Sequence, residues 1–200
     1  MSLDPGTALA AAIVAEKRGD AGIGPLPGER DQSLMYVQGI EYLASQGYIQ
    51  YEISNVARMG FSCRHNTGYW TGLDYLGLGP SAVSTINSQR LVNPTDHILW
   101  QSAVKSGKPC AVPEEIDKTA RLLETVMLRL RTAKGLPLDL YRELSGRDFI
   151  RDHGPLVRLL ASRKLAALRK RHLRLTVTGM LVSNSIIEKL FERLNTLNTG

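Results

Sequence analysis

The chain has 200 residues, of which 43% are hydrophobic and 22% are charged, a composition typical of a globular protein with a buried core. Its longest apolar runs are too short to cross a bilayer, and its first residues lack the basic flank and apolar stretch of a signal peptide, so we expect a cytoplasmic protein. Residues 1–100 carry 6 basic and 9 acidic side chains whereas residues 101–200 carry 19 basic and 10 acidic, which indicates two units with different surroundings or one face directed at an anionic partner.

The predicted elements of the first half alternate between helix and strand. A glycine at position 47 stands where a helix should end, and a strand follows it directly. Helix, glycine and strand in this order indicate half of a β-α-β unit. The predicted elements are, in order, a helix over residues 8–17, a Gly/Pro-rich loop over 19–28, a helix over 29–46, a strand over 48–53, a long aromatic loop over 58–74 and a short strand over 75–78.

The second half is predicted to be mostly helical. A Pro-containing linker near residue 109 marks a boundary between one unit over residues 4–108 and another over residues 109–194. Helices followed by a helix and a hairpin are the pattern of a winged helix. The predicted elements are a helix from the N-cap Asp96 to Gly107, a helix over 117–133 capped with the help of Glu114 and Glu115, a helix over 138–144 ended by Gly146, a helix over 155–162 with Pro155 in its first turn, strands over 165–168 and 173–177, and a final helix capped by Thr178.

Cysteine and histidine residues are few and widely spaced. Cys63 and Cys110 form no CxxC or CxxxCxxC cluster, and a structural zinc or iron–sulfur cluster usually needs four such ligands. We therefore predict two free thiols and no metal site. The four histidines are His65, His97, His153 and His172.

Polar, aromatic and glycine residues are densest between residues 51 and 82. In α/β folds, ligands lie outside the C-terminal ends of strands, and Gly77 and Gly79 would let a flat ligand approach the backbone. An imidazole in this stretch could ligate iron or donate a hydrogen bond, and two large aromatic side chains could wall an aromatic ligand. The alternative is a hydrogen-bonded structural histidine with aromatics that fill a core. The candidate residues are Glu52, Asn55, His65, Asn66, Tyr69 and Trp70.

These segments together resemble the oxygen-independent coproporphyrinogen III oxidase-like radical-SAM proteins. The resemblance is carried by Tyr51-Glu52-Ile53-Ser54-Asn55, by the spacing His65-Asn66-x-x-Tyr69-Trp70 and by Tyr75-Leu76-Gly77-x-Gly79-Pro80. Asp4-Pro5-Gly6-Thr7, Ser81-Ala82-Val83-Ser84 and residues 179–184 also fit, although many members have Gly where Ser81 stands. The residues of the first two motifs are more similar to the branch of the family that resembles a haem chaperone than to the true dehydrogenases.

The resemblance implies an α/β fold, the C-terminal part of a partial TIM-type radical-SAM barrel, followed by a small mostly helical, winged-helix-like domain. It also implies a [4Fe-4S] cluster held by a CxxxCxxC motif, S-adenosylmethionine with contacts at Ala82 and Val83, and haem or coproporphyrinogen III as the tetrapyrrole, with a haem-accepting protein as a further partner. Because the cluster cysteines are absent from this sequence, we expect native sequence before Asp4 and no oxidase activity in this segment alone.

A nucleic-acid-binding module is the second interpretation. Residues 158–174 hold seven basic side chains and no acid, and such a cluster could neutralise phosphates. However, the segment over 156–160 at the recognition-helix position is too apolar to read base edges. A solvated basic hairpin is therefore preferred, and a face for an acidic partner protein or for substrate propionates is a further alternative. The basic residues are Arg158, Arg163, Lys164, Arg169, Lys170, Arg171 and Arg174.

Overall fold

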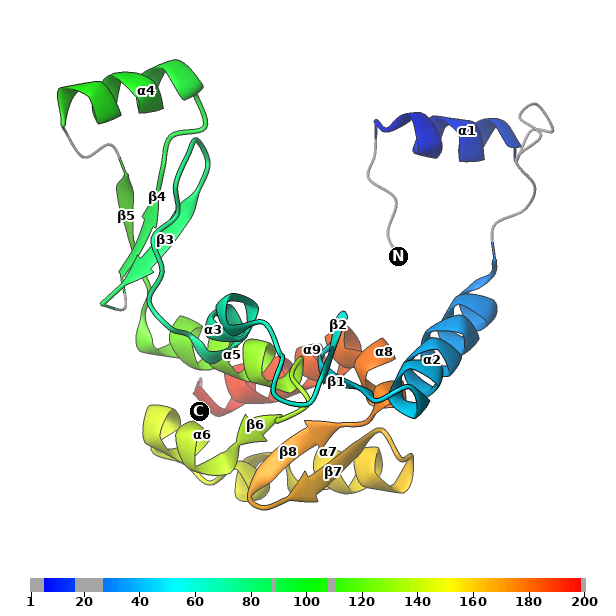
Figure 1. Cartoon of the computed structure of the whole chain (residues 1–200). Helices are drawn as coiled ribbons and strands as arrows, with labels where there is room; N and C mark the ends of the chain where they lie inside the picture. Colours follow the sequence, from blue (N-terminus) through cyan, green and yellow to red (C-terminus); the bar gives the residue numbers. More distant parts are fainter. Residues whose placement is uncertain (1–5, 17–26, 88, 108–110, 199–200) are drawn as a thin grey trace. The chain divides into compact units, whose positions relative to one another are not determined.

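A computed structural model gives the fold of the chain as a mixture of helices and strands, in agreement with the predicted α/β class (Figure 1). By compactness the chain divides into two units, which meet in the sequence between Gly39 and Ile40. Within the described part of the chain, no helix is long and apolar enough to cross a membrane. The described residues are 6–16, 27–87, 89–107 and 111–198.

Two helices occupy the start of the chain. α1 (Ala8–Glu16) follows Thr7, whose hydroxyl accepts a hydrogen bond from the N–H of Ala10 at 3.2 Å. α2 (Glu29–Ser45) ends just before Gly47, whose φ of 83° favours glycine at this position. Both predicted helices are confirmed, whereas the Gly/Pro-rich loop between them lies mostly outside the described residues.

The segment after α2 differs most from its predicted elements. β1 (Tyr48–Glu52) is confirmed as a strand, but it pairs antiparallel with β2 (Asn55–Arg58) across a two-residue turn. The expectation of a β-α-β unit is therefore wrong for the pairing of β1, because a helix-to-strand pattern does not specify the partner of the strand. The predicted aromatic loop contains a helix, α3 (Arg64–Thr71). The predicted strand over residues 75–78 is reduced to a single bridge between Tyr75 and Thr85.

A second antiparallel sheet has the order β3-β4-β5. It consists of β3 (Val83–Ile86), β4 (Gln89–Val92) and β5 (Val112–Glu115). The predicted helix α4 (His97–Ser106) is confirmed, because Asp96 accepts hydrogen bonds from the N–H groups of Ile98 and Leu99 and Gly107 ends the helix with a φ of 64°. The expectation that Glu114 and Glu115 cap the next helix is wrong, since both lie in β5.

The rest of the chain forms a helical part around a third sheet, of order β6-β8-β7. The sheet is antiparallel, and α5, α6 and α7 pack against it (Figure 1). The elements of this helical part are, in order, α5 (Lys118–Leu130), β6 (Leu136–Pro137), α6 (Leu138–Ser145), α7 (Phe149–Ser162), β7 (Ala166–Arg169), β8 (His172–Leu175), α8 (Val177–Leu181) and α9 (Ser183–Asn198).

Two predicted helix starts in this part are wrong. α7 begins earlier than predicted because Asp148 accepts hydrogen bonds from the N–H groups of Ile150 and Arg151, which places Pro155 inside the helix and not in its first turn. The cap expected from Thr178 comes instead from Thr176, which accepts the N–H of Gly179 at 3.0 Å. The final helical stretch is therefore divided into α8 and α9.

The main hydrophobic core lies within this helical part. α5 contributes Leu122, Val126 and Leu130 from one face, as expected for apolar residues at spacings of four. The sheet and the last helix supply the opposite side, with Leu173 and Leu190 fully buried. β1 is attached to the same part, because the N–H of Ile53 donates to the carbonyl of Arg131 at 2.8 Å.

Candidate functional site

α3 carries the His-Asn-x-x-Tyr-Trp segment, and the residues around it set both helix ends. Its first turn is capped by Cys63, whose Sγ accepts the N–H of Asn66 at 3.5 Å. Its last turn ends at Gly72 in the left-handed region, and Nη2 of Arg129 donates to the carbonyl of Thr71 at 3.0 Å. The helix therefore places His65 and Tyr69 one turn apart on the same face.

Three rings form a continuous row, which we call the aromatic row: His65, Tyr69 and Tyr75. The ring centroids of His65 and Tyr69 are 4.7 Å apart, and those of Tyr69 and Tyr75 are 4.5 Å apart, both in edge-to-face geometry. His65 is exposed, and Tyr69 is 40% exposed. The aromatic row thus presents an imidazole and aromatic faces to solvent. It includes Tyr75, which belongs to a family-like segment but not to the candidate site residues expected from the sequence.

Asn66 and Trp70 have other surroundings. Nδ2 of Asn66 donates to the hydroxyl of Tyr51 at 3.2 Å, which joins α3 to β1. Trp70 is half-buried, and its indole Nε1 is buried without a hydrogen-bond partner among the described residues. Of the four residues expected together, only His65 and Tyr69 are in ring contact. Asn66 instead bonds α3 to β1, and the indole N–H of Trp70 is buried.

Glu52 and Asn55 lie on either side of the turn between β1 and β2. Glu52 is 1% exposed, and its Oε1 has no hydrogen-bond partner among the described residues. Asn55 is exposed. The backbone beside Glu52 is held to the end of α5, since the N–H of Ala133 donates to the carbonyl of Tyr51 at 3.0 Å.

Ala82 and Val83 lie half-buried at the start of β3, where the chain passes close to Gly77. A Cβ on Gly77 would lie 2.2 Å from the carbonyl oxygen of Val83, and the N–H of Gly77 donates to Oγ of Ser84 at 3.0 Å. The close backbone approach that was expected for a ligand at Gly77 is therefore occupied by β3 itself.

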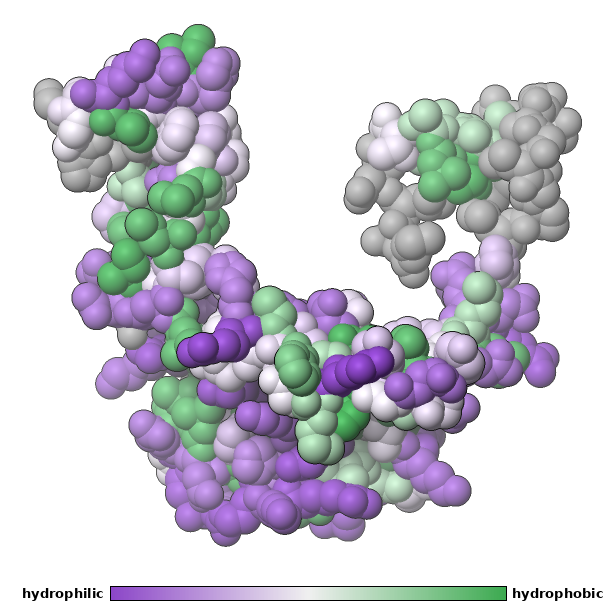
Figure 2. Space-filling view, viewed as in Figure 1, coloured by the Kyte–Doolittle hydropathy of each residue, from purple (hydrophilic) through white to green (hydrophobic). Residues whose placement is uncertain are grey.

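The surface around this stretch is apolar. Leu76 and Leu78 are 66% and 83% exposed, and hydrophobic residues gather over β3 and β4 (Figure 2). Ser81 has a φ of 61°, a conformation that favours glycine. This explains in physical terms why a glycine fits at this position of the resembling family.

The described residues offer no metal centre. Cys63 is an exposed free thiol that caps α3, and Cys110 lies outside the described residues. No group of three or more His, Cys, Asp and Glu side chains among the described residues could hold a metal ion. The residues present therefore do not fit an iron–sulfur cluster, which needs a set of thiolates.

The basic residues between 158 and 174 do not form a uniform free surface. Arg171 forms an ion pair with Asp139 at 2.5 Å, and Arg163 ends α7. Val157 and Leu160, at the expected recognition-helix position, are buried in the core. This face of α7 is therefore a packing surface, which does not favour the nucleic-acid interpretation.

Comparison with known proteins places these features among relatives. Residues 116–182 match the HemN C-terminal domain family. The chain is 36% identical to the heme chaperone HemW of Synechocystis over 124 residues, which are 60% of this chain and 29% of that protein. It is 28% identical to the heme chaperone HemW of Lactococcus lactis over 167 residues, which are 82% of this chain and 43% of that protein.

A solved structure gives the same fold. The radical-SAM coproporphyrinogen III oxidase HemN from Escherichia coli matches 88% of this chain and 44% of its own length, with a TM-score of 0.62 and 16% sequence identity. The chain spans less than half the length of these relatives. The family match, the HemW relatives and the HemN fold together show that the chain is similar to the C-terminal part of HemN/HemW-like proteins.

Proposed function

We propose that the chain is part of a HemW-like heme chaperone and that the aromatic row contacts the haem. The exposed aromatic row is the observation that carries this proposal. Haem is flat and apolar, so aromatic side chains can pack against its face or edge. A neutral imidazole is a common axial ligand of haem iron, and the exposed His65 can approach such an iron without rearrangement of the core.

The HemW relatives favour the chaperone over the dehydrogenase. Several carry the name heme chaperone HemW, from Synechocystis, Lactococcus lactis and Bacillus subtilis. HemN supports the fold alone, because its identity is low. We therefore take haem as the preferred tetrapyrrole and coproporphyrinogen III as the second, and we propose a haem-accepting protein as the partner that receives the cargo.

The radical-SAM relationship adds two groups that belong to the whole protein. We propose that a [4Fe-4S] cluster is held by residues outside this chain and that S-adenosylmethionine contacts Ala82 and Val83 at the start of β3. We also propose that residues 4–108 belong to a partial TIM-type barrel. Residues 109–194 would then form the winged-helix-like domain, with β7 and β8 as its hairpin.

The test is a titration of hemin into the 200-residue chain, followed by the Soret band. We expect a shifted band that saturates, and its loss or a shift to a high-spin form in His65→Ala. Tyr69→Ala should weaken the affinity and leave the ligation spectrum unchanged. His97→Ala is the matched control, because His97 is also exposed at the start of a helix but lies outside the aromatic row.

Two outcomes would contradict this proposal. If His65→Ala keeps the wild-type band and affinity, His65 is not the iron ligand. If His97→Ala and His65→Ala weaken binding equally, the haem is bound by exposed histidines in general and the aromatic row has no special role.

A further inference from the structure

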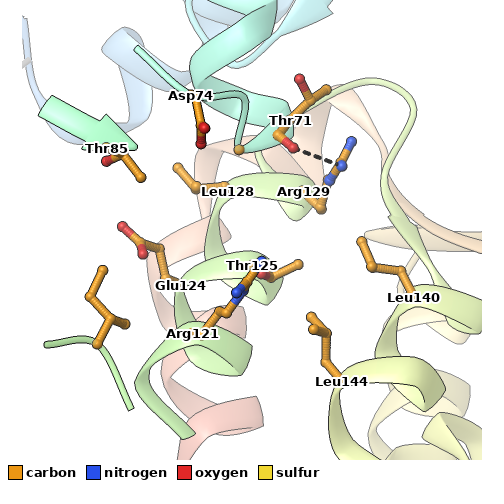
Figure 3. A pocket seen from close by; sticks show the side chains of 12 residues that line it. Thr71, Asp74, Thr85, Arg121, Glu124, Thr125, Leu128, Arg129, Leu140 and Leu144 are labelled. Carbon is orange, nitrogen blue, oxygen red and sulfur yellow. Dashed lines mark hydrogen bonds between the residues drawn. The ribbon is translucent and has the colours of Figure 1, made fainter. Parts of the chain in front are cut away.

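A small cavity lies beside α5, and none of the three residues of the aromatic row lines it. Its volume is about 180 Å³, and it is bounded by the end of α3, by α5 and by α6 (Figure 3). Arg121, Thr125 and Arg129 lie at spacings of four along α5, so they share one face of that helix. Leu140 and Leu144 of α6 close the apolar side.

Arg129 is the central cation of this cavity. It is half-buried, and no carboxylate of the described residues forms an ion pair with it. One of its five N–H donors bonds to the carbonyl of Thr71, a neutral acceptor (Figure 3). Burial lowers the pKa of Arg129 from its usual value, although the guanidinium stays protonated at neutral pH. A half-buried cation without an acidic partner among the described residues is costly to desolvate, so an anion that enters here would relieve the cost.

The two acids that line the same cavity already have partners. Glu124 forms an ion pair with Arg90, and Oδ2 of Asp74 accepts the backbone N–H of Asn87 at 3.0 Å. Within the described part of the chain they leave Arg129 without a counter-ion, but they keep the local potential from becoming strongly positive. This balance suits an anion with a single charge better than a phosphate with two.

The size of the cavity restricts the ligand further. Pockets that hold drug-sized ligands measure about 300–1,000 Å³, so this cavity is too small for a macrocycle. It has room for one planar acid group with a short alkyl arm. A carboxylate matches the fork of a guanidinium in geometry as well as in charge.

We propose that this cavity binds a carboxylate group, with Arg129 as its cation, Thr125 as a hydroxyl partner and Leu140 and Leu144 against its alkyl arm. The carboxylate is either a small free acid or the acid arm of a larger ligand. The second source rests on the proposed haem function, since haem carries two propionate arms.

The experiment is a titration of the 200-residue chain with sodium propionate, followed by the arginine Nε–H signals in NMR spectra at constant ionic strength. We expect one arginine signal, assigned to Arg129 by its loss in Arg129→Gln, to shift and saturate. Arg129→Lys and Thr125→Val should keep the fold. Arg129→Lys should weaken binding about tenfold or more, as expected from the loss of charge-assisted hydrogen bonds. Arg163→Gln is the matched control, because Arg163 is an exposed helix-end arginine outside the cavity.

The outcomes separate the proposals. Shifts that sodium chloride reproduces, equal affinity in Arg129→Lys, or tighter binding of inorganic phosphate would each overturn the carboxylate site. A parallel titration compares hemin with its dimethyl ester in wild type and Arg129→Lys. If Arg129→Lys binds hemin more weakly than the wild type does but binds the ester equally well, the carboxylate belongs to the tetrapyrrole. If Arg129→Lys and the wild type bind hemin with equal affinity, the carboxylate belongs to a free acid. If hemin does not bind at all, the haem function fails while the propionate titration still decides the cavity.

Discussion

The side-chain amide of Asn66 donates a hydrogen bond to the hydroxyl of Tyr51 at 3.2 Å, and this bond joins two segments that the sequence places 15 residues apart. Tyr51 lies in β1, whose backbone is bonded to the end of α5, and Asn66 lies in α3, which carries the aromatic row. The position of the aromatic row is therefore coupled to the helical core through one side-chain contact in addition to the packing of α3 against α5.

We predict that Asn66→Ala and Tyr51→Phe are coupled in stability. Each should lower the free energy of unfolding by about 0.5–1.5 kcal/mol, the usual net contribution of one partly buried hydrogen bond. Because both remove the same bond, their effects should not add in the double variant. Urea unfolding of the four proteins measures the coupling. Additive losses would show that the bond contributes nothing to the folded state.

Gly77→Ala should destabilise the chain near the start of β3. The new Cβ would lie 2.2 Å from the carbonyl oxygen of Val83, so the backbone of one segment must shift, at a cost of about 1–3 kcal/mol. Gly39→Ala is the matched control, because Gly39 lies inside α2 with no atom within 4 Å of a new Cβ. That change should stabilise α2 by up to about 1 kcal/mol. Thermal unfolding of both variants checks the opposite signs, and a neutral Gly77→Ala would contradict the close approach.

The helices that the sequence predicted well are those with strong local signals. α4 and α5 have Asp at the cap position, and α5 also has an apolar face at spacings of four. α3 lacks both signals, because its cap is the sulfur of Cys63 and its eight residues include Gly68 and few apolar side chains. Local sequence reasoning therefore described it as a loop.

Strand pairing and the site residues were likewise predictable only where the local sequence carries a signal. The sequence could not show that β1 turns back onto β2, because pairing depends on a turn whose residues, Ile53 and Ser54, carry no strong turn signal. His65 and Tyr69 were found through their spacing in the motif. Tyr75 joins them only through the fold. Arg129 was missed because a sequence does not show which arginine lacks an acid, although the spacing of Arg121, Thr125 and Arg129 was a signal on α5.

A buried polar network in the helical core gives a further prediction. The hydroxyl of Tyr141 donates to Oδ2 of Asp152 at 2.9 Å, and Nε of Arg147 donates to the same oxygen at 3.0 Å. Burial raises the pKa of Tyr141, and so does its bond to Asp152. Burial also raises the pKa of Asp152, but the hydrogen bonds from Arg147 and Tyr141 outweigh it and hold that pKa below its usual value.

Tyr141→Phe should therefore destabilise the chain by about 1–3 kcal/mol, because a buried carboxylate loses one of its donors while the ring still fills its place. Urea unfolding at pH 7 measures the change. Tyr42→Phe is the control, since Tyr42 is 66% exposed and its loss should be close to zero. An equal effect in both variants would show that the network adds no stability.

His153 lies in the same network and should make stability depend on pH. The pKa of His153 is lowered from 6.5 to about 4, chiefly by burial; the charge of Asp152 opposes this shift, and the positive charges of Arg193 and Arg147 contribute to it. Nε2 of His153 lies 3.4 Å from the hydroxyl of Tyr141, and its Nδ1 is buried without a partner among the described residues. The ring is therefore neutral in the folded chain at pH 7.

Between pH 6.5 and about 4, the unfolded chain binds a proton at His153 that the folded chain does not bind. The stability from the neutral ring is thus complete above pH 6.5 and is lost as the pH falls through this window, with a loss of about 2 kcal/mol between pH 7 and pH 5. Asp152 acts in a lower window, because its pKa lies below 3.8. Urea unfolding at pH 7, 6 and 5 measures the slope. His153→Gln should flatten it and His172→Gln should not; a slope in His153→Gln equal to that of the wild type would assign the pH dependence to another group.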